Sequence, residues 1–223
     1  MRDAGFSAKK VRAAGYTSTE ACSANWTVEV LKEAGYTCYE LREANRTAEE
    51  LKGVGFELQD LKAAGFPTHE LQAVGFNAEE LRAAGTSLSD LASAGATVAD
   101  LKAAGISAIG LKAEGIPLAE LKVAGYTLKE LKTAGFKTLE LRAVGFEAHE
   151  LTSAGYTVAE LKEGGYTTAE ELRAAGCMVR DLKEAGFAAG ALRRGGFSAE
   201  DLTAGGYTCK ELRDGGYSAS DLK

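Results

Sequence analysis

Residues 124–133, AGYTLKELKT, are one copy of a ten-residue motif that repeats along the whole chain of 223 residues. The glycine position of the motif recurs at every tenth residue from 5 to 165, shifts by one, and continues from 176 to 216. It holds Gly in every copy except at Asn25 and Asn45. The second leucine position, occupied here by Leu131, holds Leu everywhere except at Val11 and Ala21. The chain is therefore an array of 22 tandem decapeptide repeats, with no linker or composition shift to mark a second domain.

Each repeat carries the signals that start and end a short helix. Thr127 followed three residues later by Glu130 is a capping box, in which the hydroxyl accepts a backbone N–H and the carboxylate reaches back to the cap. Gly135 stands just past the helix, where a residue with positive φ ends it. Asn25 and Asn45 suit the same role, because Asn is the best-tolerated non-glycine residue in that conformation. We therefore predict one helix of about seven residues in each repeat.

An aromatic residue follows most of the glycine positions and links adjacent helices. Tyr126 can pack forward onto Leu131, and Phe136 can pack back onto the same leucine. Because isolated helices this short are unstable in water, neighbouring repeats must stack on one another. The predicted fold is all-α, a solenoid of very short helices with roughly four helices per superhelical coil, in a single unit that covers residues 1–223.

Two departures from the repeat occur near the C-terminus. One extra residue lies in the repeat at 166–172, and the capping box survives best as Thr168 with Glu171, which leaves Thr167 in the turn. Four glycines replace alanine in the core stripe, and each lowers helix propensity by about 1 kcal/mol. We expect this part of the chain to be more mobile or more closely packed. The four are Gly164, Gly195, Gly205 and Gly215.

Composition and charge argue against several classes of protein. No run of about 18 apolar residues occurs, so no transmembrane helix is expected, and the opening MRDAGFSAKK lacks the apolar run of a secretory signal. The net charge of −6 argues against a general attraction to nucleic acid or anionic membrane. We expect an intracellular, soluble protein, either in the cytoplasm or in an organelle lumen or stroma.

The sequence contains no recognisable catalytic or metal-binding pattern. His69 and His149 share one helix position and have no partner at metal-ligand spacing, so we expect both to be exposed. The basic position after the leucine, as at Lys132, is typical of a solvent-exposed helix face. The alternative is that these basic residues form a stripe that binds a phosphate backbone. Its acidic neighbour Glu130 is two residues away, so any ion pair must form between neighbouring coils. We predict no enzyme activity, no catalytic residue, no cofactor and no bound metal.

The four cysteines are predicted to be free thiols, because a chain of this size needs no disulfide framework. Cys38, Cys177 and Cys209 occupy aromatic or small-apolar positions and are expected to be buried. Cys22 occupies the basic position and is expected to be more exposed.

Two surfaces are candidates for docking. The first and last repeats have no neighbour on one side, and exposed apolar faces of this kind mark interaction sites. We expect association with a protein partner, a longer assembly or a second copy through this end-docking surface: Phe6, Val11, Leu212, Tyr217 and Leu222. Midway along the chain the aromatic position loses its rings, which indicates either a docked partner or simple drift, at Thr86, Ala96, Ile106 and Ile116.

The function that this pattern favours is a non-enzymatic scaffold, spacer or linker that mediates protein–protein interaction within a larger assembly. An alternative is a rod that mimics nucleic acid and binds a nucleic-acid enzyme, although the interleaved basic residues argue against it. A third reading is an ice- or surface-binding protein, since hydroxyl side chains recur at a fixed period. We expect no nucleic-acid partner and no insertion into membranes.

Overall fold

The computed structural model describes residues 5–222, and its helices fall into two units, Met1–Ile106 and Ser107–Lys223. Within the described residues every element is an α-helix of six residues. The first unit contains α1 (Ala8–Ala13), α2 (Ser18–Ser23), α3 (Val28–Glu33), α4 (Cys38–Glu43), α5 (Ala48–Gly53), α6 (Leu58–Ala63), α7 (Thr68–Ala73), α8 (Ala78–Ala83), α9 (Leu88–Ser93) and α10 (Val98–Ala103). The second contains α11 (Ala108–Ala113), α12 (Leu118–Val123), α13 (Leu128–Thr133), α14 (Thr138–Ala143), α15 (Ala148–Ser153), α16 (Val158–Glu163), α17 (Ala169–Ala174), α18 (Val179–Glu184), α19 (Ala189–Arg194), α20 (Ala199–Ala204) and α21 (Cys209–Asp214).

The predicted helix boundaries are confirmed in the quoted repeat. Thr127 has the extended backbone of an N-cap, and its hydroxyl accepts from the Glu130 N–H at 3.3 Å. The Glu130 carboxylate accepts from the Thr127 N–H at 2.7 Å, which completes the capping box. Gly135 has φ +73°, and Asn25 and Asn45 have φ +59° and +60°. The left-handed ending that the sequence predicts is therefore present, including at both asparagines.

Leucines and rings form the core of each unit. The N–H of Phe136 donates to the Leu131 carbonyl at 3.1 Å, so the aromatic residue closes the end of the helix that precedes it. Leu131 is fully buried and Phe136 is 7% exposed. Deep burial of a small number of large side chains per repeat is what offsets the low stability of a six-residue helix.

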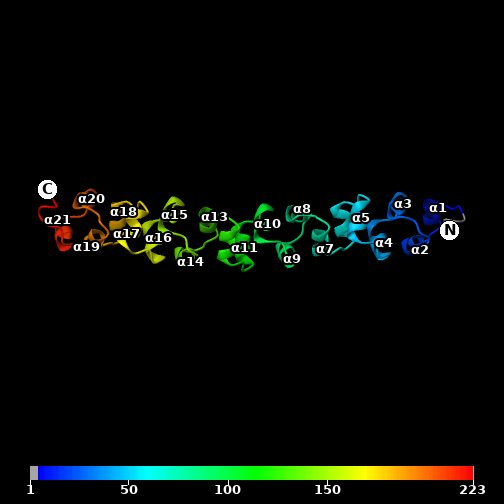
Figure 1. Ribbon diagram of the computed structural model, residues 1–223, viewed down its shortest axis with the longest axis horizontal. Coiled ribbons are helices and arrows are strands. Elements are labelled where there is room, and N and C mark those ends of the chain that lie inside the picture. Colours follow the sequence, from blue (N-terminus) through cyan, green and yellow to red (C-terminus); the bar gives the residue numbers. More distant parts are fainter. Residues whose placement is uncertain (1–4, 223) are drawn as a thin grey trace. The chain divides into compact units, whose positions relative to one another are not determined.

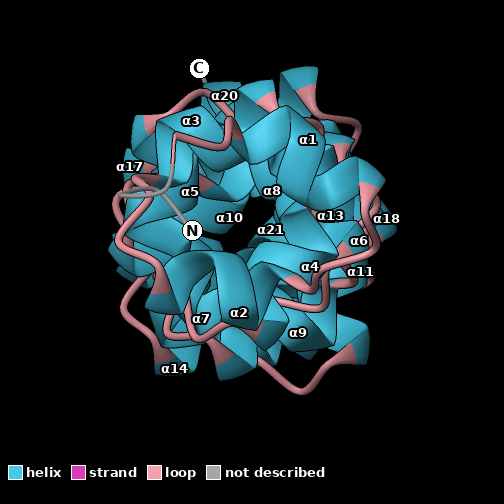
Figure 2. Ribbon diagram, turned by 90° about the vertical axis from the view of Figure 1, so that its right-hand side faces the viewer, coloured by secondary structure: helices cyan, strands magenta, loops and turns pink. Residues whose placement is uncertain are grey.

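Within each unit helices pack against the helix two positions along, as in the pairs α2 and α4 or α17 and α19. Successive helices lie on opposite sides of a unit, as Figure 1 shows for α1 to α4. The view of Figure 2 shows the loops that join successive helices running around the outside of the stack. The expected four helices per coil are wrong, because four per coil would place each helix against the fourth one along. An αL residue followed by an extended N-cap sends the next helix across the stack rather than around a quarter turn.

The extra residue of the repeat at 166–172 lies in the connection between α16 and α17. Thr168 is the N-cap of α17, and its hydroxyl accepts from the Glu171 N–H at 3.3 Å. Tyr166 and Thr167 precede it in non-helical conformation. The insertion therefore lengthens the turn and leaves the six-residue helix intact, with Thr168 as the N-cap, as the sequence predicts. Of the predicted capping box only the Thr168 side-chain bonds to Glu171 are formed.

Candidate functional site

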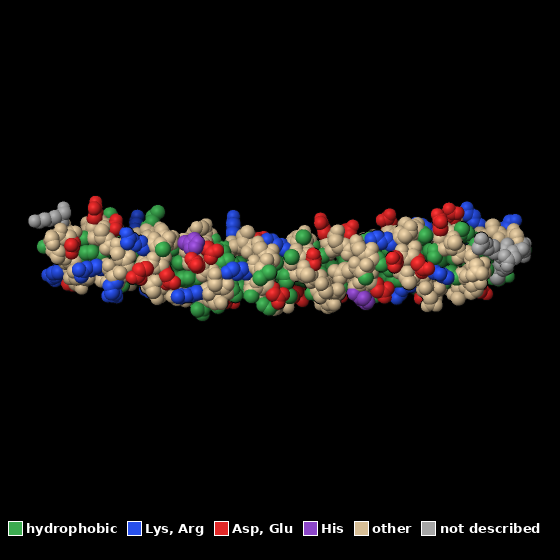
Figure 3. Space-filling model, in the orientation of Figure 1, with side chains coloured by type: hydrophobic (Ala, Val, Ile, Leu, Met, Phe, Trp, Pro, Cys, Tyr) green, Lys and Arg blue, Asp and Glu red, His purple; other side chains and the backbone are tan. Residues whose placement is uncertain are grey.

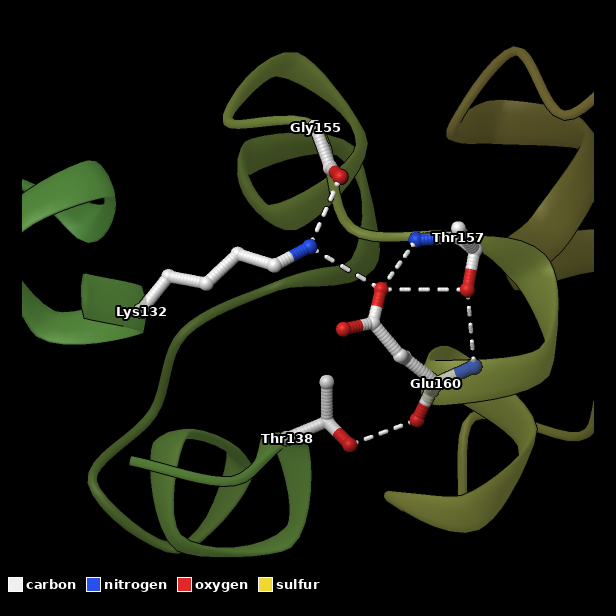
Figure 4. Close-up of polar contacts among 5 residues, drawn as sticks. All are labelled: Lys132, Thr138, Gly155, Thr157 and Glu160. Carbon is white, nitrogen blue, oxygen red and sulfur yellow. Dashed lines mark hydrogen bonds and ion pairs between the residues drawn. The ribbon is translucent and has the colours of Figure 1, made fainter. Parts of the chain in front are cut away.

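A recurring contact, here called the clasp, joins a basic side chain of one helix to the end of the helix two positions along and to the aromatic residue that follows it; in places it also reaches the carboxylate of the next helix. Figure 4 shows it at Lys132, whose ammonium donates to the Gly155 carbonyl at 2.8 Å and to the Glu160 carboxylate at 3.0 Å. The same ammonium lies 4.2 Å from the centre of the Tyr156 ring. The C-terminal carbonyls of a helix are electron-rich and the ring face is negative, so both attract a cation.

The carboxylate of the clasp also caps the helix that it belongs to. Glu160 accepts from the Thr157 N–H at 2.7 Å and from the Thr157 hydroxyl at 3.0 Å, and the Glu160 carbonyl accepts from Thr138 at 2.5 Å (Figure 4). Burial raises the pKa of Glu160, but the Thr157 N–H and Lys132 lower it by more, so the net shift is downward. The group is therefore held in its charged form.

The clasp is repeated in both units. The basic residue donates to a helix-end carbonyl 22 or 23 residues on, for example from Arg42 to Ala64 at 2.7 Å and from Lys162 to Ala185 at 2.6 Å. The cation lies between 4.1 and 5.9 Å from a ring centre in the pairs Arg12–Tyr36, Lys32–Phe56, Arg42–Phe66, Lys52–Phe76, Lys112–Phe136, Lys122–Phe146, Lys132–Tyr156, Arg142–Tyr166, Lys162–Phe187, Arg173–Phe197, Lys183–Tyr207 and Arg193–Tyr217.

The clasp corrects the expectation that the basic position is a freely solvated face. These side chains bind backbone and ring within the chain, and their stems cover apolar surface. The expected pairing of charges between neighbouring coils is confirmed at Lys132–Glu160 and at Lys183–Glu211, which are 3.0 and 3.2 Å apart. Figure 3 shows blue and red side chains interspersed along the visible face of both units.

At four places in the sequence both partners of the clasp are replaced: Cys22 and Arg46, Gln72 and Ala96, Ala92 and Ile116, and Thr152 and Cys177. Two of them retain a polar contact in the structure. In the first unit Cys22 replaces the cation and Arg46 replaces the ring, so the basic group now comes from the connection between α4 and α5. Hydrogen bonding to Cys22 is the main reason that the pKa of Arg46 is raised, and Arg46 also pairs with Glu50 at 3.3 Å. In the second unit Thr152 replaces the cation and Cys177 replaces the ring, and the Thr152 hydroxyl donates to the Ala175 carbonyl at 2.9 Å.

An open groove of about 510 Å³ lies at the altered clasp of the second unit. Its walls include Tyr156 and Val158, each 6% exposed, and Met178, which is 72% exposed. Grooves at regular clasps of the same unit measure about 350 Å³ beside Arg142 and Tyr166 and about 550 Å³ beside Lys183 and Tyr207, so the altered clasp differs in its lining rather than in its size. We call it the Thr152–Cys177 groove; its lining is Thr152, Gly155, Tyr156, Thr157, Val158, Ala159, Gly176, Cys177, Met178, Asp181, Glu184 and Ala185.

A comparison with protein families finds one match, described as a decapeptide repeat region, over residues 1–68, 35–108, 105–170 and 155–223. These overlapping matches cover the entire chain. The chain belongs to the decapeptide repeat family. No curated protein and no solved structure matches it.

In this decapeptide repeat chain the predicted end-docking surface is only partly exposed. Phe6 is 56% and Leu222 is 40% exposed, whereas Val11, Leu212 and Tyr217 are buried at 4%, 0% and 7%. The expectation that all five are exposed is wrong. Val11 and Leu212 occupy the leucine position and Tyr217 the aromatic position, which are buried in most other repeats as well. End-to-end association remains a prediction, and Phe6 and Leu222 are its accessible residues.

The four mid-chain positions without rings, Thr86, Ala96, Ile106 and Ile116, are all half-buried. Thr86 is part of a modified clasp, since its hydroxyl accepts from the Lys62 ammonium at 3.0 Å. A hydroxyl thus replaces the ring as partner of the cation at this position. A docked partner at these four residues stays a prediction.

His69 and His149 are exposed, as the sequence predicts. Between residues 5 and 222 no group of three or more His, Cys, Asp or Glu side chains could hold a metal ion. The absence of a bound metal stays a prediction. The four cysteines are free and Cys38 is buried, as predicted. Cys177, which the sequence predicts to be buried, is only half-buried, as is Cys22. Burial is the main reason that the pKa of Cys38 rises to about 11. No helix of the described residues is long and apolar enough to cross a membrane.

The prediction that Cys209 is buried is wrong, because this thiol is exposed. Its position opens a helix and is normally covered by the C-cap residue found 26 residues later, as Val179 is by Gly205. For Cys209 the covering position falls after residue 223.

Proposed function

We propose that the chain is a non-enzymatic structural scaffold, spacer or linker that mediates protein–protein interaction within a larger assembly. The observation that supports this proposal is the clasp, which engages the Lys, Glu and Thr side chains of the repeat in contacts within the chain. A protein built in this way offers a long repeated surface, on which a few altered repeats can identify a partner. The Thr152–Cys177 groove is one such alteration.

The same contacts make the other two functions less favourable. A nucleic-acid mimic needs an unbroken acidic face, whereas Glu160 and Glu211 each pair with a lysine. An ice-binding face needs free hydroxyls at lattice spacing, whereas cap hydroxyls such as that of Thr127 accept from the helix and donate to a carboxylate.

The proposal is tested with the immobilised full chain in a lysate of its source cells, with nuclease present and at about 0.15 M salt. We expect at least one protein to bind and, once purified, to form a complex of fixed stoichiometry by light scattering. An unrelated protein of equal charge serves as the control. Absence of any stoichiometric complex contradicts the scaffold. Displacement of the bound protein by duplex DNA supports the nucleic-acid mimic instead.

A further inference from the structure

The Thr152–Cys177 groove retains the acceptors of a clasp after both of its side-chain partners have been replaced. In a regular clasp of the same unit, Lys132 binds the Gly155 carbonyl and the Glu160 carboxylate. Allowing for the one-residue insertion, the equivalent acceptors for position 152 are the Gly176 carbonyl and the Asp181 carboxylate. The Thr152 side chain carries no charge and is too short to reach these two acceptors. Its hydroxyl donates to the Ala175 and His149 carbonyls instead.

The acidic acceptor of this groove has no cation. Among residues 5–222, no hydrogen bond or ion pair reaches the Asp181 side chain, and Asp181 is exposed. The residue at the N-cap, Met178, has no side-chain hydroxyl to donate to that carboxylate. Two glutamates of the same unit, by contrast, receive both a cap hydroxyl and a lysine: Glu160 from Thr157 and Lys132, and Glu211 from Thr208 and Lys183. A carboxylate next to an unpaired carbonyl favours a cation.

The wall beside these acceptors is apolar. Tyr156 and Val158 are buried in it, while most of the Met178 side chain is exposed. Burial is the main reason that the pKa of the Cys177 thiol is raised, with the Asp181 charge adding to it, so this wall stays uncharged. Methionine is a flexible side chain that adapts to apolar ligands. The space corresponds to the position where other repeats place an aromatic ring, such as Tyr166 or Tyr207.

We propose that the Thr152–Cys177 groove binds a lysine or arginine side chain of a partner protein, together with an adjacent aromatic residue that takes the place of the missing ring. The partner supplies from outside what the chain supplies to itself in its other clasps: a cation for Gly176 and Asp181, and a ring to cover Cys177. The internal cation–ring pairs named above indicate that this scaffold accommodates such a group. This inference rests on the proposed protein-binding function and specifies the chemistry of the partner.

The experiment titrates the ¹⁵N-labelled full chain with the synthetic peptide acetyl-Gly-Phe-Lys-Gly-amide and follows backbone amide shifts. We expect shifts at Gly176, Cys177 and Asp181, and binding about threefold tighter than that of the same peptide with norleucine in place of lysine. The variant Asp181→Asn should reduce the affinity for the lysine peptide to that of the norleucine peptide. Because Asp181 is exposed, this variant is expected to fold.

A second variant restores the internal clasp. Thr152→Lys combined with Cys177→Phe should fill the groove and abolish the peptide-induced shifts, with a thermal midpoint at or above that of the parent chain. The inference is wrong if the lysine and norleucine peptides bind equally to the parent, or if the double variant still responds at Gly176. Peptide binding without any captured protein contradicts the proposed function alone. A protein partner that both variants retain contradicts this site alone.

Discussion

Glycine has opposite effects in α5 of the first unit and in the stack of α17 and α19 of the second. Gly53 is the last residue of α5, and a Cβ atom added there would meet nothing within 4 Å. Gly195 is the C-cap of α19, and a Cβ atom there would lie 2.2 Å from the Cβ of Ala169 in α17. Gly205 is equally tight against Val179, at 2.3 Å. Of the two outcomes expected for the C-terminal glycines, closer packing is the one observed.

The difference shows that helix propensity alone does not give the effect of a glycine in this repeat. At Gly53 the glycine only lowers the helix propensity of α5, because a methyl group at this position would contact nothing. At Gly195 the same loss permits a close approach of two helices, since an alanine would overlap its neighbour. Which case applies depends on whether the position faces the helix two places along.

The largest expected effect is that of Gly195→Ala. Forcing a methyl group into this contact should lower the free energy of unfolding by about 1–3 kcal/mol, because the overlapping atom on Ala169 belongs to a short, rigid side chain. Gly53→Ala should raise it by about 0.4–1 kcal/mol, since the conformation is helical and the space is open. Urea unfolding of both variants beside the parent chain measures the contrast. Equal effects of the two substitutions would show that the close approach of α17 and α19 is not real.

The next effect tests the left-handed helix endings. Gly135 has φ +73°, and an added Cβ would meet only the Lys112 ammonium at 3.9 Å, so any loss comes from backbone strain. Gly135→Ala should destabilise by about 1 kcal/mol, and Gly135→Asn by less, because Asn25 and Asn45 already adopt this conformation. Gly110→Ala, inside α11, should stabilise. Thermal melting of the three variants should give this order, and a fully tolerated alanine at 135 would contradict the assignment.

The clasp should contribute a smaller amount. Lys132→Met keeps the apolar stem but removes the cation from Gly155, Glu160 and the Tyr156 ring, and it should cost about 0.5–1 kcal/mol for this half-exposed group. Thr152→Met, at the altered clasp, removes uncharged hydroxyl contacts to the Ala175 and His149 carbonyls and should cost less. Urea unfolding at low and at high salt separates the two, because only the Lys132 contribution weakens with salt. A Thr152→Met loss as large as that of Lys132→Met would contradict the comparison.

Features that depend on residues within one repeat could be predicted from the sequence. The capping box of Thr127 and Glu130 and the ending at Gly135 lie within nine residues, and local hydrogen bonds determine both. The stacking partner could not be predicted in the same way, because it depends on the direction in which each turn sends the chain. A small change in that direction decides whether a helix meets the second or the fourth one along.

The clasp was missed for the same reason, although the sequence carries a signal for it. Cys22 replaces a basic residue, and 24 residues later Arg46 replaces a ring. Thr152 and Cys177 change together in the same way, with the inserted residue making the spacing 25. Paired departures at a fixed spacing indicate side chains in contact, so a search for them would have predicted the two-helix stacking and located the groove.

The smallest expected effect contrasts α21, which has a capping box, with α19, which has none because Ala188 and Ala191 occupy its cap and N3 positions. Hydrogen bonds from the Thr208 N–H and hydroxyl, followed by Lys183, lower the pKa of Glu211 in the folded chain below its usual 4.5. A carboxyl with a lowered folded pKa stabilises the fold above its unfolded pKa, and this contribution is lost as the pH falls through the folded value. Amide hydrogen exchange, corrected for intrinsic rates, should therefore show α21 losing protection relative to α19 between pH 6 and about pH 3.

Glu211→Gln should remove this pH dependence of α21, whereas Ala191→Gln should leave the pH dependence of α19 unchanged. Equal losses of protection in α19 and α21 would mean that acid weakens the stack as a whole rather than through its helix caps.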